Sequence, residues 1–406
     1  MILRGARQTG KTWLLKEFGR LHFRELVYVN FEETPNLRTV FKSDFDIKRI
    51  ISTLEIYSKK VISSEDTLIV FDEIQSAENG ITSLKYFCEN APRYYVIAAG
   101  SLLGMGLHSN VSFPVGKVDF MDLRPMTFSE FLMALNEDGI ADTLRNNDWV
   151  TLSLFHNKLI EYLKYYLYVG GMPEVVKVFS ETRDWELVRK VQTQILNSYE
   201  ADFSKHTPGE IVPRVRMVWN SIPSQLAKEN KKFVYGIIRE GARAKDFELA
   251  IQWLVDCGLL IKIHRVSKPG IPLIAYQDLS VFKLFLLDVG LLGAMAGIQI
   301  SVLLDGNDVF TEFRGALTEQ YVMQQLRIDS NRYIGYWTNE RSTSEVDFVM
   351  QDKENIIPIE VKSGENLRAK SFRLFCEKYT PVKAIRTALT PYKEENWMTN
   401  VPLYGI

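Results

Sequence analysis

Hydrophobic residues in the first 135 positions gather in short apolar runs that are separated by polar segments. The run TLIVFD at 67–72 is continuous, and it lies between the runs ELVYVNF at 25–31 and YYVIAAGS at 94–101. A continuous apolar run of this length is typical of a parallel strand that is covered on both faces. The segment TWLLKEFGR at 12–20 has the spacing of a helix. This part of the chain therefore predicts an α/β fold built on a parallel sheet.

The middle of the chain changes to helical spacing. Between residues 148 and 205 apolar residues recur every three or four positions, as in LIEYLKYYLYV and LVRKVQTQILNSY, and GGMP at 170–173 interrupts them as a turn. The next block predicts a helix at 213–227, a short element at 234–241, a helix at 245–258 and a strand at 259–266. A helix followed by a two-stranded wing is a common way to enter a DNA groove, so this block predicts a winged-helix-like domain.

The C-terminal part combines one helix with several strands. The segment FRGALTEQYVMQQL at 313–326 predicts a helix with Glu319 beside its inward face, and YIGYWT, SEVDFVMQ and IIPIEVKSG predict three strands. Side chains two apart on a strand share a face, so Glu360 and Lys362 project together. Asp347 lies between two apolar neighbours in the preceding strand.

The composition bounds the class of protein. The chain of 406 residues is 46% apolar, which is enough for two or three domains with their own cores. Its 49 basic and 50 acidic residues leave a net charge of −1, which argues against a globally basic nucleic-acid coat but not against a local basic face. The three cysteines form no CxxC pair, the five histidines have no zinc-ligand spacing, and no apolar run suits a signal peptide or a bilayer span. These features predict a cytoplasmic protein without a membrane partner.

The segment GARQTGKT at 5–12 satisfies the pattern G-x-x-x-x-G-K-[ST] in full. Its glycines let successive backbone N–H groups close around phosphate oxygens, while Lys11 would reach the β- and γ-phosphates and the Thr12 hydroxyl would coordinate Mg²⁺. The alternative is a glycine turn before an ordinary helix. The pattern favours a site for ATP and Mg²⁺. Its predicted residues are Gly5, Ala6, Arg7, Gln8, Thr9, Gly10, Lys11, Thr12, Trp13, Asp72 and Ser101.

Two carboxylates follow the buried strand at 67–72. Asp72 is expected to hold Mg²⁺ through water, and Glu73 is expected to orient and deprotonate the attacking water. The alternative is a strand that leaves the core through an acidic turn. ATPases with this additional glutamate have a strand between the phosphate-loop strand and the aspartate-bearing one. The run at 94–101 is the candidate, with Ser101 at its tip as a γ-phosphate sensor.

A second candidate centre lies near the end of the chain. An Asp that is followed, after a hairpin, by Glu-x-Lys is the arrangement of restriction-endonuclease-like nucleases. Asp347 and Glu360 would bind a divalent ion, Glu319 would join them from the helix, and Lys362 would polarise the attacking water or steady the phosphorane charge. The alternative is a structural Glu–Lys pair. Unpaired charges inside such apolar runs would be costly unless a metal or a partner is present.

Several motifs together resemble a known family. GARQTGKT, VFDEIQ, AAGS, LRPMTFSEFL and YLYVGGMPEVV occur in the order found in bacterial and archaeal AAA-type ATPases whose C-terminal half is a conserved domain of unknown function. The family's loop usually reads Gly-Pro-Arg-Gln-x-Gly-Lys-Thr, and Ala6 stands here in place of the proline. Ala99 replaces a threonine that usually precedes Ser101 by two residues. Relatives carry a helical segment before the first strand, whereas this sequence starts at the strand.

The resemblance extends to the C-terminal part. Glu319, Asp347, Glu360 and Lys362 match positions of the family's C-terminal domain, which is nuclease-like by fold, with or without cleavage. The resemblance implies an ATP- and Mg²⁺-dependent ATPase whose class often forms rings. Three arginines are candidates for stabilising transition-state charge: Arg7, Arg93 and Arg124. Arg124 matches a family position but is also suited to a surface salt bridge.

Four regions are therefore expected: a P-loop AAA-type ATPase domain at 1–135, a helical lid or linker at 136–208, a winged-helix-like domain at 209–300 and a nuclease-like α/β domain at 301–406. One hypothesis is a DNA-directed ATPase, and the other is a nucleotide-gated switch with a non-cleaving C-terminal domain. DNA contact and a merely solvated basic face remain alternatives for the third region. Its basic residues are Lys231, Lys232, Arg239, Arg243, Lys245, Lys262 and His264.

Overall fold

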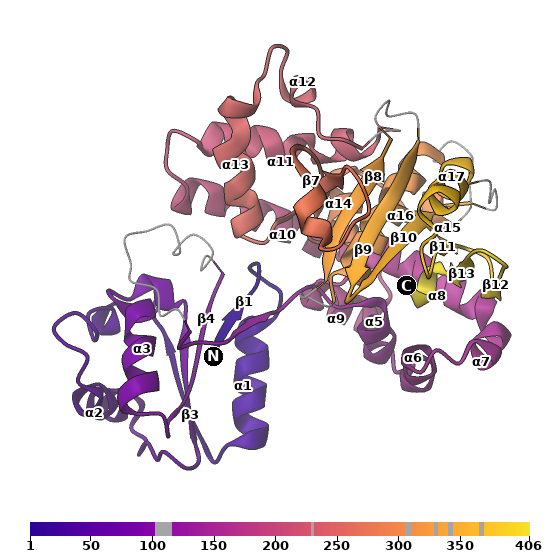
Figure 1. Ribbon diagram of the computed structural model, residues 1–406. Coiled ribbons are helices and arrows are strands. Elements are labelled where there is room, and N and C mark those ends of the chain that lie inside the picture. Colours follow the sequence, from indigo (N-terminus) through magenta and orange to yellow (C-terminus); the bar gives the residue numbers. More distant parts are fainter. Residues whose placement is uncertain (102–115, 229–230, 305–310, 329–331, 340–343, 365–368) are drawn as a thin grey trace. The chain divides into compact units, whose positions relative to one another are not determined.

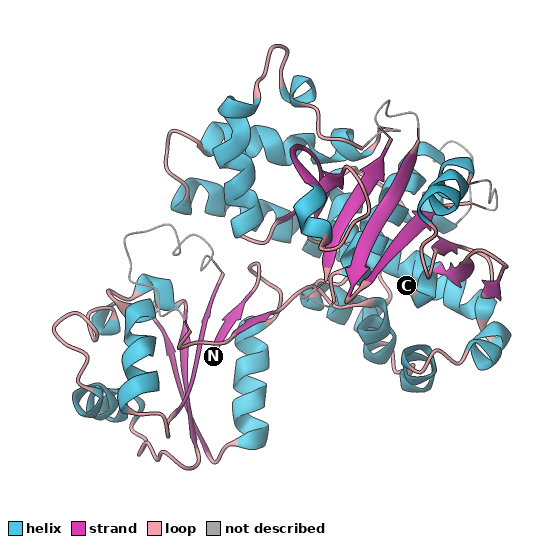
Figure 2. Ribbon diagram, viewed as in Figure 1, coloured by secondary structure: helices cyan, strands magenta, loops and turns pink. Residues whose placement is uncertain are grey.

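The computed structural model describes residues 1–101, 116–228, 231–304, 311–328, 332–339, 344–364 and 369–406. These residues form two compact units. The N-terminal unit comprises Met1–Arg124 and Asp256–Leu259, and the C-terminal unit comprises Pro125–Val255 and Leu260–Ile406. Both units combine helices with strands (Figure 2), which confirms the α/β class.

The N-terminal unit is built on a parallel sheet of five strands, in the order β2-β3-β4-β1-β5. Strand β4 lies between β1 and β3, as predicted for the run at 94–101. The short strand β5 was not predicted, because its three residues are exposed and form no buried apolar run. The elements are β1 (Ile2–Arg4), α1 (Lys11–His22), β2 (Glu25–Asn30), η1 (Pro35–Leu37), α2 (Ile47–Ser58), β3 (Thr67–Asp72), η2 (Ile74–Ser76), α3 (Gly80–Asn90), β4 (Tyr95–Gly100) and β5 (Phe120–Asp122).

Helices cover both faces of this sheet (Figure 1), which explains why all six residues of β3 are buried. Leu68 and Val70 share a core with Leu15 of α1 on one face. Ile69 and Phe71 point to the other face, into a core that also contains apolar residues of α2 and α3. A continuous apolar run is therefore required, because each successive side chain enters one core or the other. The sheet ends at Asp72, beside the predicted nucleotide site.

The C-terminal unit begins with helices, as the spacing between residues 148 and 205 predicted. Its helices are α5 (Phe128–Ala134), α6 (Asp138–Arg145), α7 (Trp149–Leu154), α8 (His156–Val169), α9 (Pro173–Thr182), α10 (Trp185–His206), α11 (Val212–Leu226), α12 (Tyr235–Ile238), α13 (Ala244–Asp256), α14 (Val289–Met295), α15 (Ile300–Leu304), α16 (Thr311–Leu326) and α17 (Lys370–Tyr379), with short turns η3 (Leu273–Tyr276) and η5 (Leu403–Gly405). Within the described ranges no helix is long and apolar enough to cross a membrane.

The predicted turn at 170–173 separates α8 from α9. Asp288 holds this turn from the start of α14: it is fully buried and accepts hydrogen bonds from the Gly171 N–H at 2.6 Å and the Leu291 N–H at 2.9 Å. Gly170 has a φ of 76°, and a Cβ added there would lie 2.2 Å from the Asp288 carboxylate. The turn therefore needs glycine, because a side chain would displace the buried carboxylate.

A mixed sheet of eight strands forms the rest of this unit, in the order β12-β13-β11-β10-β9-β8-β6-β7. Its strands are β6 (Leu260–Val266), β7 (Gln277–Leu286), β8 (Tyr333–Thr338), β9 (Glu345–Asp352), β10 (Asn355–Val361), β11 (Ile385–Ala388), β12 (Lys393–Glu394) and β13 (Thr399–Pro402). The three predicted strands are β8, β9 and β10, which pair as an antiparallel set. The hairpin β6–β7 joins the same sheet beside β8, so strands from both sides of the predicted boundary at 300/301 share it.

Candidate functional site

The phosphate loop (residues 5–12) connects β1 to α1 in the N-terminal unit. Gln8 and Gly10 have positive φ angles of 65° and 92°, and Gly10 is the cap residue of α1. Gly5 packs so closely against the main chain just after β5 that an added Cβ would lie 2.3 Å from the Leu123 carbonyl oxygen. The loop thus turns tightly in front of a helix of 12 residues. A helix N-terminus of this kind presents backbone N–H groups to anions.

Lys11 reaches back over the loop. Its ammonium group donates to the Gly5 carbonyl at 2.8 Å and to the Ala6 carbonyl at 2.7 Å, and the residue is only 6% exposed. Burial lowers the pKa of Lys11 to about 8, although the carboxylates of Glu73 and Asp72 act in the opposite direction. The ammonium is therefore positioned at the loop, where it donates to neutral carbonyl oxygens that an anionic ligand could replace.

Asp72 connects the end of β3 to the start of α1. Its Oδ2 atom accepts hydrogen bonds from the Thr12 hydroxyl at 2.7 Å and from the Tyr28 hydroxyl at 2.8 Å, and its Oδ1 atom accepts the Glu73 N–H at 3.0 Å. Asp72 is 2% exposed. The two residues predicted to hold magnesium, Thr12 and Asp72, are therefore direct neighbours although 60 positions separate them in the chain.

Glu73 follows in a left-handed backbone conformation, with a φ of 49°. Its carboxylate accepts hydrogen bonds from the Gln75 side chain and from the Ser101 hydroxyl, whose oxygen lies 3.2 Å from Oε1 and 3.3 Å from Oε2. Arg7 of the phosphate loop donates to the same hydroxyl at 3.3 Å and pairs with Glu32 at 3.2 Å. The predicted base and the predicted sensor are thus linked to each other and to the loop.

The other predicted residues of this site differ in their surroundings. Ala6 and Thr9 are buried, and the Thr9 hydroxyl donates to the Ala6 carbonyl at 2.9 Å. Trp13 is 70% exposed on α1. Of the candidate arginines, Arg93 is exposed, and Arg124 lies 3.8 Å from the Asp122 carboxylate, the arrangement expected of a salt-bridge partner.

Three contributors to this network were not predicted: Tyr28, Glu32 and Gln75. Tyr28 lies in the last half of β2, and Glu32 lies just after this strand. Strand β2 pairs with β3 so that Asn30 is opposite Asp72. Ligands of open α/β sheets bind at the carboxyl ends of the strands. The polar residues of the segment YVNFEE were therefore an available signal.

The donor set fits a magnesium–triphosphate. A hydroxyl and a carboxylate are the hard oxygen ligands that Mg²⁺ prefers. They lie beside a buried ammonium group and a helix N-terminus, both of which favour phosphate oxygens. Thr12 and Asp72 would hold the ion, and Lys11 with the loop N–H groups would hold the phosphates.

A second group of charged residues, some of them buried, lies in the C-terminal unit, and we call it the carboxylate–lysine cluster. Asp347 of β9 accepts the Val361 N–H at 2.8 Å, and continuing the β9–β10 register by one residue brings Glu360 opposite Asp347. Lys362 donates to Glu360 at 2.7 Å, as expected for side chains that share a face. Glu319 of α16 is buried, as predicted. The cluster consists of Glu319, Glu345, Asp347, Glu360, Lys231, Lys283 and Lys362.

Two lysines of the cluster differ from what the sequence predicted. Lys231 was expected on a basic surface, but this is wrong: it is 8% exposed and pairs with Glu319. Lys283 of β7 was not predicted to belong to this site. It is fully buried, pairs with Glu345 and lies 3.9 Å from Glu319. Each lysine is far in sequence from its partner, so local patterns contained no signal for either pair.

The charges of the cluster shift one another. Burial raises the pKa of the Asp347 carboxyl well above its usual range, and the neighbouring carboxylates of Glu319 and Glu360 raise it further. Burial also raises the pKa of Glu360. Burial acts in the same direction on Glu319, but the ammonium groups of Lys231 and Lys283 outweigh it and leave the pKa of Glu319 below its usual value. Asp347 is therefore the member that most favours its protonated form.

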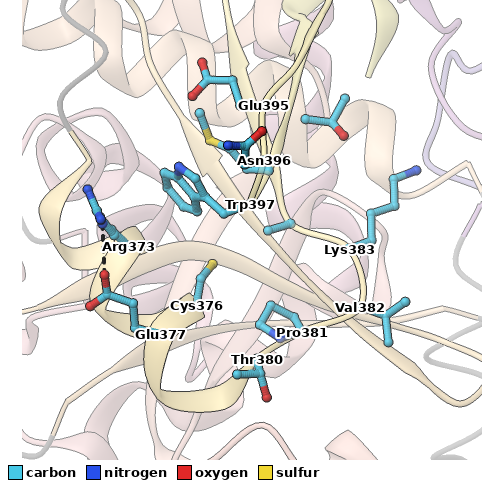
Figure 3. Close-up of a pocket in the computed structure, with 13 residues that line it drawn as sticks. Arg373, Cys376, Glu377, Thr380, Pro381, Val382, Lys383, Glu395, Asn396 and Trp397 are labelled. Carbon is cyan, nitrogen blue, oxygen red and sulfur yellow. Dashed lines mark hydrogen bonds and ion pairs between the residues drawn. The ribbon is translucent and has the colours of Figure 1, made fainter.

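The described parts of the chain contain no group of three or more His, Cys, Asp or Glu side chains arranged to hold a metal ion. A separate open cavity of about 480 Å³ lies near α17 (Figure 3). Trp397 and the Arg373–Glu377 ion pair line it, together with Lys383 and Cys376. None of the predicted site residues is among its described lining residues.

The geometry of the N-terminal unit defines the class of this part of the protein. Residues 1–132 match a family described as an AAA domain. The parallel sheet and the phosphate loop of the N-terminal unit agree with this match. Residues 160–301 match a domain of unknown function (DUF8612), and residues 314–404 match another (DUF4143). The C-terminal part thus matches a domain of unknown function, as the resemblance implied, and its nuclease-like fold stays a prediction.

Comparison with solved structures found distant likenesses. The Walker-type ATPase PABY2304 of Pyrococcus abyssi is 13% identical, with a TM-score of 0.44, covering 73% of this chain and 90% of that one. The Orc1 protein of Aeropyrum pernix in complex with DNA is 14% identical, with a TM-score of 0.29, covering 73% and 86%. Drosophila ORC bound to DNA is 16% identical, with a TM-score of 0.24, covering 74% and 90%. The comparison with curated proteins found no match.

Proposed function

We propose that this protein binds Mg·ATP at the phosphate loop and hydrolyses it. The observation that carries the proposal is the hydrogen bond of 2.7 Å between the Thr12 hydroxyl and the Asp72 carboxylate. It joins the loop to the end of β3, so that two oxygen ligands suited to magnesium converge at the helix N-terminus. A glycine turn before an ordinary helix would not require this hydrogen bond.

Each neighbouring residue then has a defined part. Lys11 and the backbone N–H groups of the loop would bind the phosphates, and Mg²⁺ would neutralise charge on the phosphate oxygens. Glu73 would accept a proton from the attacking water. Ser101 lies between Glu73 and Arg7, so it is suited to report a bound γ-phosphate to the base. Because Glu73 is already engaged by Ser101 and Gln75, we expect slow turnover until the nucleotide rearranges these hydrogen bonds.

The test is phosphate release by the full-length chain with Mg²⁺ and ATP. Glu73→Gln is expected to lower release by about 10²–10⁴-fold, the usual contribution of a general base, while ATP binding persists. Glu33→Gln is the matched control, because Glu33 is also a glutamate near a strand end but is exposed. Equal release by the wild type and Glu73→Gln would overturn the role of Glu73, and absence of ATP binding by the wild type would overturn the site.

A second proposal concerns the partner. We infer that the segment from α11 to β7 contacts DNA, because three helices and an antiparallel hairpin follow one another there and its basic residues include exposed ones. The exposed basic residues are Lys232, Arg239, Arg243 and Lys245. A duplex-binding assay at several salt concentrations tests this, since phosphate contacts release counterions. Replacing Arg239 and Arg243 with Gln should reduce the salt slope by about one for each DNA phosphate that is no longer neutralised. An unchanged slope would favour a merely solvated face.

Nuclease activity is the less supported use of the C-terminal unit. Of the residues that would bind a catalytic ion, Glu360 pairs with Lys362, and the ammonium groups of Lys283 and Lys231 act to lower the pKa of the Asp347 carboxyl. A non-cleaving domain, controlled by the nucleotide, agrees better with this arrangement. Incubation of labelled DNA with Mg²⁺ or Mn²⁺ should therefore give no cleavage beyond that of Asp347→Ala. Cleavage that disappears in Asp347→Ala and in Lys362→Ala would restore the nuclease hypothesis.

A further inference from the structure

The carboxylate–lysine cluster brings carboxylates from separate elements together, but they are not arranged to hold a metal ion, and the cluster contains its own cations. Four carboxylates come from α16, β9 and β10, and three ammonium groups come from the segment before Phe233, from β7 and from the end of β10. Much of the cluster lies in the interior: Lys231, Lys283, Glu319 and Glu360 are buried, whereas Glu345, Asp347 and Lys362 are partly exposed. So many charges in one interior are costly unless they compensate one another.

Lys283 is the central cation of the cluster. It is 0% exposed, pairs with Glu345, lies 3.9 Å from the Oε2 atom of Glu319, and places its ammonium 4.7 Å from the centre of the Tyr336 ring. A lysine in this position approaches two carboxylates from different elements, α16 and β9. That is the spatial role of a metal ion, which also draws ligands from separate elements.

Two carboxylate oxygens still lack a hydrogen-bond donor. Glu319 Oε2 and Glu360 Oε2 are both buried, and neither has a hydrogen-bond partner among the described residues. The hydrogen-bonded lysines use the other oxygen, since Lys231 donates to Glu319 Oε1 and Lys362 donates to Glu360 Oε1. Lys283 lies 3.9 Å from Glu319 Oε2, as an ion-pair partner without a hydrogen bond. Buried carboxylate oxygens without donors are uncommon, and they are available to a cation that is not a hydrogen-bond donor.

Charge counting separates the possible occupants. With every group ionised, four carboxylates and three ammonium groups leave the cluster with one negative charge. Protonation of one carboxyl would make it neutral, and a divalent ion would instead leave it with one positive charge. Without Lys283 the same count is two negative charges, which is the charge that a divalent ion cancels. The native cluster therefore has no electrostatic need of a divalent ion, and a cluster without Lys283 does.

We propose that the ammonium group of Lys283 is a built-in cation that takes the place of a divalent metal ion in this cluster, so that the C-terminal unit works without metal. Replacing Lys283 with a neutral residue of similar size would then convert the cluster into a Mn²⁺ or Mg²⁺ site formed by Glu319, Glu345 and Asp347. This inference is independent of the ATP site, which lies in the other unit.

The test is Mn²⁺ binding to the full-length chain without nucleotide, measured by electron paramagnetic resonance of free Mn²⁺. Asp72→Asn is present in every variant so that the ATP site does not contribute. The parent should bind no Mn²⁺ that depends on Asp347, and Lys283→Met should gain one Mn²⁺ per chain. Lys283→Arg keeps the charge and should gain none. Lys283→Met combined with Asp347→Asn should lose the acquired ion.

Two results would overturn the proposal: Asp347-dependent Mn²⁺ binding by the parent, or a folded Lys283→Met variant that binds no more Mn²⁺ than the parent does. If Lys283→Met does not fold by itself, refolding in the presence of Mn²⁺ is the measurement. Recovery of the native circular dichroism with Mn²⁺ but not with NaCl of equal ionic strength supports the proposal. Failure to recover with Mn²⁺ contradicts it.

Discussion

The hydrogen bond from Tyr28 to Asp72 permits a quantitative prediction about the nucleotide site. Tyr28→Phe removes one hydroxyl and retains the ring, including its interaction with Lys16, whose Nζ atom lies 4.2 Å from the ring centre. The deleted hydrogen bond is 2.8 Å long and ends on a buried carboxylate. Hydrogen bonds to charged groups contribute about 1.5–3 kcal/mol. Because Tyr28 is only half-buried and Thr12 still donates to the same oxygen, we expect a decrease of about 1–2 kcal/mol in the stability of the N-terminal unit.

The assay must report on one unit of a larger chain. Hydrogen exchange followed by mass spectrometry, on peptides that contain β2 and β3, measures the opening free energy locally. A decrease of about 1–2 kcal/mol corresponds to about 5–30-fold faster exchange in the most protected amides. Tyr57→Phe is the matched control, because Tyr57 is 44% exposed and its hydroxyl lies 3.4 Å from that of Thr34.

The control should change exchange in these peptides by less than about twofold, since exposed side chains contribute little. Equal exchange rates in Tyr28→Phe and Tyr57→Phe would refute the reasoning that Tyr28 stabilises Asp72. Faster exchange confined to peptides outside β2 and β3 would refute it as well. Either result would mean that the Thr12 hydroxyl, and not the Tyr28 hydroxyl, stabilises the Asp72 carboxylate.

Three further predictions concern titration and packing. Burial lowers the pKa of Lys11 to about 8, and a bound phosphate favours the charged form of this lysine. ATP affinity, measured by calorimetry, should therefore fall as pH rises through about 8, and Lys11→Ala should lose this pH dependence. Burial and nearby carboxylates raise the pKa of Cys376 to about 12, so Ellman's reagent at about pH 8 should modify exposed Cys88 and leave Cys376 unmodified; equal rates would contradict this. Asp288→Asn should lower the free energy of unfolding by more than about 2 kcal/mol, because it puts an amide NH₂ against the Gly171 N–H or the Leu291 N–H. The measurement is the melting temperature, which should fall; an unchanged melting temperature would contradict the prediction.

The parallel sheet was predictable because its strands are covered on both faces. Every residue of β3 enters a core, so the apolar run at 67–72 identified the strand, and the two carboxylates identified its end. The phosphate loop was predictable because its chemistry depends on residues that are adjacent in sequence. The sequence predicted that Thr12 and Asp72 serve the same ion, but it did not predict the hydrogen bond between them, because that bond joins two elements that only the folded sheet brings together.

Other features depend on distant pairing and had no local signal. Strand β5 is three exposed residues whose support is pairing with β1. Lys231 is buried because Glu319, 88 positions away, is opposite it; in the sequence it is one of two adjacent lysines and looks like a surface residue. Lys283 lies in an apolar strand, where a charge indicates a buried partner, but the pattern does not identify the partner.

The central claim is that one cation site, at the phosphate loop, serves this chain. A crystal grown with ATP and Mn²⁺, measured at the manganese absorption edge, tests it most directly. The account predicts one anomalous peak bonded to the Thr12 hydroxyl and to phosphate oxygens, next to Asp72, and no peak between Glu319 and Asp347. A manganese ion among those C-terminal carboxylates, or a triphosphate bound away from Lys11, would contradict it.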